Sequence, residues 1–356
     1  MDILNLTSNC MFLSDLGDLQ MRVDQAQTTV TIKNEDNESL YSGTAYKYGY
    51  YATIYDIHSL IEADMLLKQR SVATFTIKAT DSANTCTRTI TVIFSTQHLE
   101  GVGATTFLSN RFFSSTRAQF MAPHAKVKLY AYNNNELQRQ TITYTIVSET
   151  EDGEIITSTL TKRYVDLTGF VSIQVDYDSL KNTIATNERV EIRRLLSIDV
   201  KFSNRRMMFY VLHNDSLKIF TFRNTFNVEE VLVLPMSTTR TLETESSLAV
   251  CGAMQYQYDI EHKRSFVQET GGLLLRQAEW VEQFLTSSEV RYVRDPKGTV
   301  SDQPLILIVD YDYELSDELG EWKSLKFEWQ FANKRESLTT LDKDRIFTEQ
   351  FTNIFA

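Results

Sequence analysis

The chain has 356 residues, of which 42% are hydrophobic and 23% are charged, and it contains only 4 prolines and 12 glycines. These proportions are those of globular proteins, and they exclude a disordered or fibrous chain. The net charge of −11 argues against general binding to a nucleic-acid backbone, because such binding needs a concentrated basic face.

Three cysteines, Cys10, Cys86 and Cys251, lie far apart and form neither a disulfide framework nor a CxxC metal site. We expect buried free thiols and no cofactor. Residues 1–20 show no basic start and no long apolar core, so the sequence predicts no secretory signal. No stretch approaches the roughly 18–20 apolar residues of a membrane span. These observations predict synthesis in a cytoplasm and no membrane span.

Residues 1–97 predict a first β-domain. Short runs of alternating polar and apolar residues follow one another from Leu19 to Thr96, as in half-buried strands. One helix is predicted at residues 56–68, where Asp56 can cap the first turn. We expect this helix to cover one end of a β-sandwich.

Residues 105–213 predict a second β-sandwich domain, after a linker between Gln97 and Thr105 that contains Gly101 and Gly103. Six alternating runs are separated by turn signals at the spacing of a sandwich or meander. Strands alone are predicted in this region.

Residues 214–334 predict a third β-domain with one helix at residues 274–287, where apolar residues recur every three or four positions. Residues 335–356 form a C-terminal arm whose apolar groups are costly to expose. The arm either folds back on its own domain or docks on a neighbouring subunit. Its interface candidates are Ile346, Phe347, Phe351, Ile354 and Phe355. The predicted fold is therefore mainly β, with multi-domain antiparallel β-sandwich-like modules, the first and third each carrying one packed α-helix.

Signatures of catalysis are missing from the sequence. The five histidines make no HxH, HxxxH or HExxH pair, and there is no GxSxG, GxxxxGK[ST] or GxGxxG motif. We therefore predict that the chain is not an enzyme. A catalytic group assembled from distant segments is the alternative that local motifs leave open.

A run of carboxylates partly resembles a calcium-binding loop, with Asp310, Asp312 and Glu314 as candidate ligands. Leu315 stands where the sharp turn of such a loop needs glycine, and the flanking runs predict strands rather than helices. The favoured interpretation is a strand whose solvent face carries these carboxylates.

Two further clusters have both a structural and a functional interpretation. Tyrosines surround Gly49 and either pack in a hairpin or form a platform for stacking sugars; they are Tyr46, Tyr48, Tyr50 and Tyr51. Basic pairs at 193–194 and 205–206 predict solvated strand faces or salt bridges across a subunit contact rather than nucleic-acid contacts.

The third region has a strand opening with Arg223-Asn224, a helix after Gly271-Gly272-Leu273-Leu274 and a closing aromatic strand. This order of features resembles tail structural proteins of tailed phages and prophages of Bacteroides-type bacteria. The resemblance covers roughly residues 217–335. It implies a structural virion component at the distal tail, hub or baseplate, in a homo-oligomeric ring or collar that contacts other tail proteins. It offers no active-site residue. The alternative is a glycan- or receptor-binding sandwich module of a phage or bacterial surface system.

Overall fold

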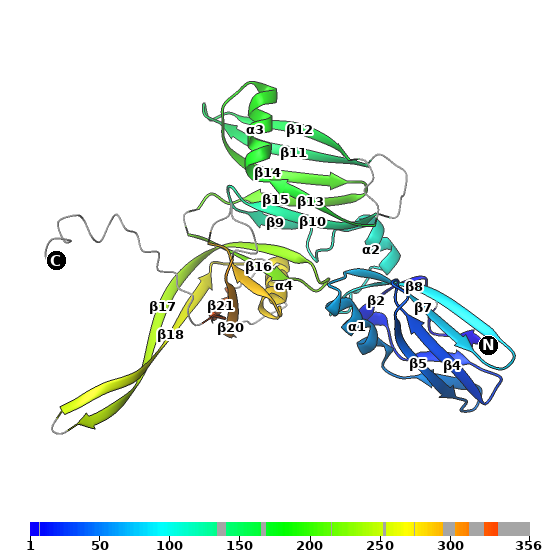
Figure 1. The fold of residues 1–356 in the computed structure, drawn as a ribbon. Coiled ribbons are helices and arrows are strands. Elements are labelled where there is room, and N and C mark those ends of the chain that lie inside the picture. The colour runs from blue at the N-terminus through cyan, green and yellow to red at the C-terminus, as the bar shows by residue number, and fades with distance from the viewer. Residues whose placement is uncertain are drawn as a thin grey trace.

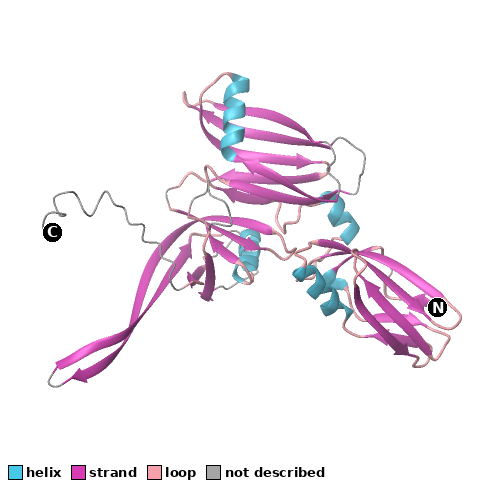
Figure 2. Ribbon diagram, in the orientation of Figure 1, coloured by secondary structure: helices cyan, strands magenta, loops and turns pink. Residues whose placement is uncertain are grey.

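The computed structural model describes residues 1–6, 8–133, 140–164, 169–214, 216–251, 254–273, 275–294, 303–312 and 324–333. Strands dominate these residues, and they group into three modules that follow one another along the chain (Figures 1 and 2). The prediction of a mainly β chain built from several sandwich-like modules is confirmed.

The N-terminal module is a sandwich of two sheets. The smaller sheet has the order β1-β3-β6, with β1 at Asp2–Ile3, β3 at Leu19–Arg22 and β6 at Tyr51–Ile54. The larger sheet has the order β2-β8-β7-β4-β5, with bounds Cys10–Phe12, Thr85–Ile93, Val72–Thr80, Gln27–Lys33 and Ser39–Tyr46. In β4 every second side chain is buried, because successive residues of a strand face opposite sides of the sheet. A short 3₁₀ helix at Leu13–Asp15 follows β2.

Helix α1 spans Ile57–Leu67, where the sequence predicts it. Asp56 caps its first turn by accepting hydrogen bonds from the backbone N–H and the hydroxyl of Ser59. Ile57, Ile61 and Met65 recur every four residues and are buried against the sandwich.

The middle module pairs a five-stranded sheet with a two-stranded one. The five-stranded sheet has the order β12-β11-β14-β15-β9, with bounds Ile155–Tyr164, Gln140–Thr150, Ile192–Phe202, Arg205–Val211 and Ala118–Met121. The other sheet pairs β10 at Lys126–Asn133 with β13 at Gly169–Asp176. A short helix, α2 at Ala104–Asn110, lies in the connection from the N-terminal module.

The middle module also contains a helix that the sequence pattern does not reveal, α3 at Tyr177–Glu188. Asp176 caps it through the Ser179 N–H, and Tyr177, Leu180 and Ile184 form its buried face. Asparagine and threonine fill much of its remaining surface, and their low helix propensity hides the period. The prediction of strands alone in this module is therefore wrong.

The third module is a closed barrel, which strand alternation alone does not distinguish from a sandwich. Its order is β16-β17-β18-β21-β20-β19, with bounds Leu217–Arg223, Glu229–Cys251, Met254–Thr270, Lys326–Phe331, Leu305–Asp312 and Val290–Tyr292. Helix α4 at Leu275–Leu285 matches the predicted helix. Phe284 of α4 packs into the barrel core against Phe220 and Phe327, with ring centroids 5.3 Å from each.

Strands β17 and β18 are much longer than the barrel wall. Beyond Met236 on β17 and before Phe266 on β18, the two strands pair with each other and with no other described strand. They project from the barrel as a two-stranded ribbon (Figure 1). Among its described side chains, Leu242, Leu248 and Met254 are each more than half exposed.

Candidate functional site

The three modules meet at one apolar cluster, which we call the junction cluster. Phe107 of α2 lies at its centre, with ring centroids 5.5 Å from Phe12, 5.5 Å from Phe113 and 4.8 Å from Phe226. Phe12 belongs to β2, and Phe226 follows β16. The full cluster is Phe12, Ile93, Ala104, Phe107, Leu108, Phe113, Phe226 and Val228. One buried aromatic core thus joins all three modules.

The turn between β16 and β17, residues 224–228, extends this contact with hydrogen bonds to the N-terminal module. The Thr96 N–H donates to the Thr225 carbonyl at 3.2 Å, and the two threonine hydroxyls lie 2.8 Å apart. Asn227, with φ +60°, donates to the Arg70 carbonyl and accepts from the Ser71 hydroxyl through its own carbonyl. The barrel is therefore fastened to the first module by polar as well as apolar contacts.

Asn224 fastens the same turn to the middle module. Its side-chain oxygen accepts from the backbone N–H groups of Phe226 and Val228, so its amide nitrogen must point the other way. That nitrogen donates to the Phe113 carbonyl at 2.9 Å and to the Glu230 carboxylate at 3.0 Å.

Glu230 is a buried carboxylate at this junction without a cationic partner among its hydrogen bonds. Its other oxygen accepts from the Ser114 hydroxyl at 2.6 Å and from the Gln119 amide. The Trp280 indole N–H lies nearby but outside hydrogen-bonding geometry. Burial raises the pKa of Glu230 above its usual range, and the neutral donors offset only part of that effect.

The titration of Glu230 predicts how stability varies with pH. Because its pKa is raised in the folded state, the folded chain holds this proton at pH values where the unfolded chain releases it. Its contribution to the free energy of unfolding is therefore largest below the ordinary glutamate pKa and falls as pH rises toward the folded pKa. We expect Glu230→Gln to make this decline shallower, as measured by urea unfolding at a series of pH values between about 4 and 8.

In the Glu230→Gln variant, stability should still decline somewhat with rising pH because of the neighbouring Glu229. Burial raises the pKa of Glu229 as well, and the charges of Lys128 and Arg223 offset part of that rise. Glu100→Gln, a replacement at an exposed position, serves as the control and is expected to leave the slope of the free energy of unfolding against pH unchanged. A Glu230→Gln profile that overlays the wild type would contradict the assignment of the titrating group.

Arg205 is the corresponding buried cation of the junction. It is 4% exposed, and its guanidinium donates to the backbone carbonyls of Leu108, Arg111 and Tyr132. Its charge also lies over the Phe202 ring, 5.5 Å from the centroid. Burial lowers the pKa of Arg205 to about 10. Since the first two carbonyls end α2, Arg205 holds the connecting helix against the middle module.

A cavity of about 200 Å³ lies where α1, the end of β8, the junction turn and the end of α4 meet. Most of its lining residues are of polar types, such as Gln97, Gln283 and Ser287, although apolar atoms make up most of the lining surface. The guanidinium of Arg223 is already bound to Glu289 and Asn227. The cavity therefore offers hydrogen-bonding groups beside an apolar surface.

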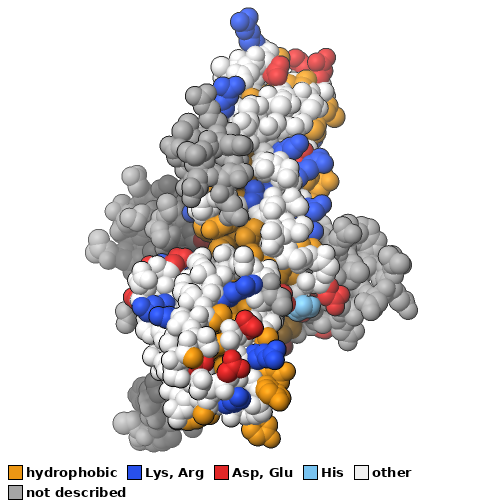
Figure 3. Space-filling model, turned by 90° about the vertical axis from the view of Figure 1, so that its right-hand side faces the viewer, with side chains coloured by type: hydrophobic (Ala, Val, Ile, Leu, Met, Phe, Trp, Pro, Cys, Tyr) orange, Lys and Arg blue, Asp and Glu red, His pale blue; other side chains and the backbone are white. Residues whose placement is uncertain are grey.

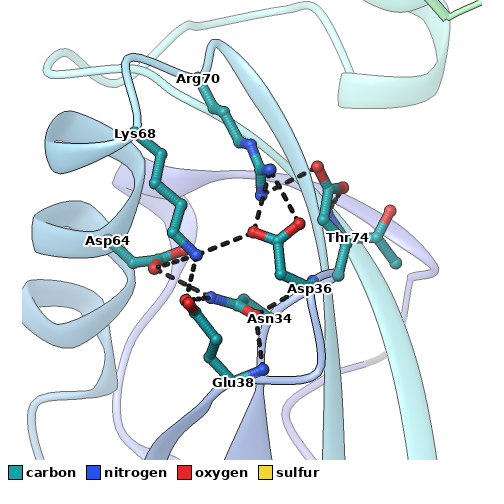
Figure 4. A network of polar contacts seen from close by, with 8 residues as sticks. Asn34, Asp36, Glu38, Asp64, Lys68, Arg70 and Thr74 are labelled. Carbon is teal, nitrogen blue, oxygen red and sulfur yellow. Dashed lines mark hydrogen bonds and ion pairs between the residues drawn. The ribbon is translucent and has the colours of Figure 1, made fainter.

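A second polar cluster lies in the N-terminal module, around Lys68 at the end of α1 (Figure 4). Its ammonium contacts Asp36 at 2.9 Å, Asp64 at 3.3 Å and Glu38. Asn34 donates to Glu38 at 2.9 Å and to Asp64 at 3.1 Å. Glu38 and the other carboxylates raise the pKa of Lys68, so this lysine stays charged and is a clamp rather than a nucleophile.

Arg70 extends the cluster toward the sheet. It contacts Glu35 at 2.9 Å and Asp36 at 3.0 Å, and Glu35 accepts from the Thr74 N–H. The hydrogen bond from Lys68 and, to a smaller extent, the one from Arg70 hold the pKa of Asp36 below its usual range. The cluster thus ties α1 and β7 to the turn between β4 and β5.

The structure separates the residues singled out in the sequence. Asp310 and Asp312 are exposed on β20, opposite Glu328 and Lys326 of β21. Glu314 and the candidates in the arm, Ile346, Phe347, Phe351, Ile354 and Phe355, lie outside the described residues. The part of the chain that is described contains no group of three or more His, Cys, Asp or Glu side chains placed to hold a metal ion.

The tyrosines are brought together on the N-terminal module and are exposed rather than packed. Tyr46 is 67% exposed, Tyr48 92%, Tyr50 71% and Tyr51 44%. Cys10 and Cys86 are free, as expected, but only half-buried. Burial raises the pKa of the Cys10 thiol.

The basic pairs form contacts within the chain. Arg193 and Arg194 both bind Glu149, and Arg206 binds Asp199. These three arginines are at least partly exposed on their strands, and the fourth, Arg205, is buried. The alternative of salt bridges across a subunit contact stays a prediction. Sequence reasoning missed the roles of Arg205 and Glu230, for which a charged residue at an inward-facing strand position was the available signal.

Within the described residues, no helix has both the length and the apolar character needed to cross a membrane. Comparison with known proteins finds no matching family model and no significant match among curated proteins.

Some solved structures show local likeness at low overall similarity. A trypsin-activated alpha-2-macroglobulin from Escherichia coli is 8% identical with a TM-score of 0.19, over 85% of this chain and 25% of that one. The calcium binding domain CBD12 of CALX1.1 is 7% identical with a TM-score of 0.16, over 54% and 74% of the two chains. A chimeric titin Z1Z2 tandem is 11% identical with a TM-score of 0.16, over 57% and 93%. The chain thus spans about a quarter of the length of the alpha-2-macroglobulin, and at these TM-scores the likenesses carry no argument about function.

Proposed function

We propose that the chain is a non-enzymatic structural protein that assembles with copies of itself and with other proteins, as a component of a bacteriophage tail. In this proposal it is made in the host cytoplasm and forms part of a ring or collar in the virion. The observation that carries the proposal is the projecting ribbon of β17 and β18 on a body of three modules that are joined by buried contacts.

The body supports an architectural role because its modules are joined by buried contacts and not by linkers alone. The junction cluster, the turn at 224–228 and the buried Arg205 connect every pair of modules with buried contacts. Loosely linked domains generally have smaller and more polar contacts, and they move relative to one another. A rigid body holds the ribbon at a defined angle, as a repeated assembly requires.

The ribbon supports an assembly role because it is incomplete by itself. A two-stranded hairpin is marginally stable in water, and no other described strand pairs with the outer edges of this one. Ribbon residues 240–244 are all exposed. Pairing of these edges with another subunit would satisfy the backbone groups and cover the exposed Leu242 and Leu248.

Shortening the ribbon tests this function. Replacing residues 241–265 by an Asn-Gly turn closes the hairpin directly after the Arg240–Phe266 pair and leaves the barrel strands intact. We expect the full chain to form an oligomer and the shortened chain to be a monomer with an unchanged thermal unfolding midpoint, by light scattering and circular dichroism.

A chain ending at Lys334 is the companion variant, since it tests the C-terminal arm separately. If the oligomer is lost only in this variant, the arm and not the ribbon mediates assembly. A full chain that stays monomeric at high concentration would contradict self-assembly.

A further inference from the structure

The N-terminal module carries an aromatic surface that the assembly role does not explain. Five tyrosines lie within residues 46–55, and we call them the tyrosine surface: Tyr46, Tyr48, Tyr50, Tyr51 and Tyr55. Their exposed fractions run from 44% for Tyr51 to 92% for Tyr48, and Tyr55 is 76% exposed. The two aliphatic neighbours, Ala52 and Ile54, are buried. Large exposed aromatic groups gathered in one place mark binding surfaces on soluble proteins.

The tyrosine surface is held in place before any ligand binds. Tyr48 and Tyr51 exchange backbone hydrogen bonds of 2.7 and 3.1 Å across a turn in which Gly49 has φ +64°. The Tyr50 carbonyl accepts from the Val23 N–H at 3.1 Å. Tyr51 continues into β6, which pairs with β3. A fixed backbone lowers the entropy that binding must overcome.

The rings are available to a ligand. Among the described residues no ring–ring contact joins the five tyrosines to one another or to other aromatic groups. Each exposed ring therefore presents an apolar face together with a hydroxyl group that can donate and accept hydrogen bonds.

The charge of this surface indicates the class of ligand. Lys47 is the only charged residue in the segment 46–55, and the exposed Arg22 of β3 pairs with Tyr51 on one side and with the exposed Asp2 on the other. Its ammonium already donates to the Asp24 carbonyl at 2.9 Å and lies 6.0 Å from the centre of the Tyr50 ring. One lysine that is already bound and one arginine beside an aspartate do not make the concentrated basic face that a nucleic acid or an anionic membrane needs. The viewed face of the molecule in Figure 3 likewise shows hydrophobic side chains in separate patches among both charges.

We propose that the tyrosine surface binds a neutral saccharide chain. The apolar C–H faces of pyranose rings stack on the exposed phenol rings, and the sugar hydroxyls bond to the tyrosine hydroxyls and to Lys47. A polypeptide is the competing occupant, since tyrosine is also enriched at protein interfaces, and retardation by a polysaccharide distinguishes the two.

Affinity electrophoresis of the full chain in gels containing one soluble neutral polysaccharide each tests this proposal. The probes are a β-glucan, a galactomannan, a xylan and a bacterial cell-surface polysaccharide. We expect at least one to retard the wild-type chain, and we expect the double variant Tyr48→Ala, Tyr50→Ala to bind that polysaccharide roughly tenfold more weakly.

Two controls separate stacking from a general loss of structure. Tyr210→Ala removes a half-exposed tyrosine of the middle module and should leave retardation unchanged. Tyr48→Phe, Tyr50→Phe keeps the rings and should retain more binding than the alanine pair. Absence of retardation by every polysaccharide, or retardation that the alanine pair leaves intact, would overturn the proposal, whatever the oligomeric state of the chain.

Discussion

Replacing Arg205 by methionine is expected to lower the free energy of unfolding by about 3–5 kcal/mol, as measured by urea denaturation followed by circular dichroism. Methionine keeps much of the apolar stem but leaves the carbonyls of Leu108, Arg111 and Tyr132 without this donor. A buried acceptor that loses its only partner costs about 1–3 kcal/mol. The loss is large because one planar guanidinium serves all three carbonyls.

The adjacent Arg206 provides a matched control. Its guanidinium is largely exposed and binds Asp199 on the neighbouring strand. Exposed ion pairs contribute about 0–1 kcal/mol, so Arg206→Met should change stability little. If the two substitutions cost the same, the buried carbonyl contacts of Arg205 do not stabilise the junction.

Replacing Phe107 by alanine is expected to lower the free energy of unfolding by about 3–5 kcal/mol and to loosen the modules. Phe107 is 4% exposed and touches rings from the N-terminal module and from the barrel turn. Its removal leaves a cavity at the point where the modules share one core. We expect unfolding in denaturant to separate into more than one transition and the radius of gyration to rise in small-angle scattering.

Phe107→Leu is the conservative control, since most of the apolar volume remains and the smaller cavity should cost less than the cavity of the alanine variant. Leu67→Ala, at a side chain that is 83% exposed, should be nearly neutral. A Phe107→Ala chain that unfolds in a single transition at the wild-type midpoint would show that the junction cluster does not couple the modules.

The local pattern of the sequence predicts much of the fold. Alternation identifies strands such as β4 and β21, because successive side chains of a strand face opposite sides. The recurrence of apolar residues every three or four positions identifies α1 and α4 almost to their ends. The same rule fails for α3, because only three of its positions are buried and its exposed face is made of poor helix formers.

The candidate sites divide in the same way. A run of tyrosines is visible in the sequence, but whether their rings pack or face solvent depends on which other segments cover them in the fold. In the structure these tyrosines are largely exposed. The sequence by itself determined the β-rich composition, the strands and two of the helices, since these depend on residues close together in the chain.

Only the tertiary structure decided that the third sheet closes into a barrel, that β17 and β18 leave it as a ribbon, and that the modules share one core. Glu230 meets Ser114 across 116 positions of the chain, and Arg205 meets Leu108 across 97. Such contacts form because strand pairing and burial bring distant segments together, and local periodicity carries no information about which segments those are.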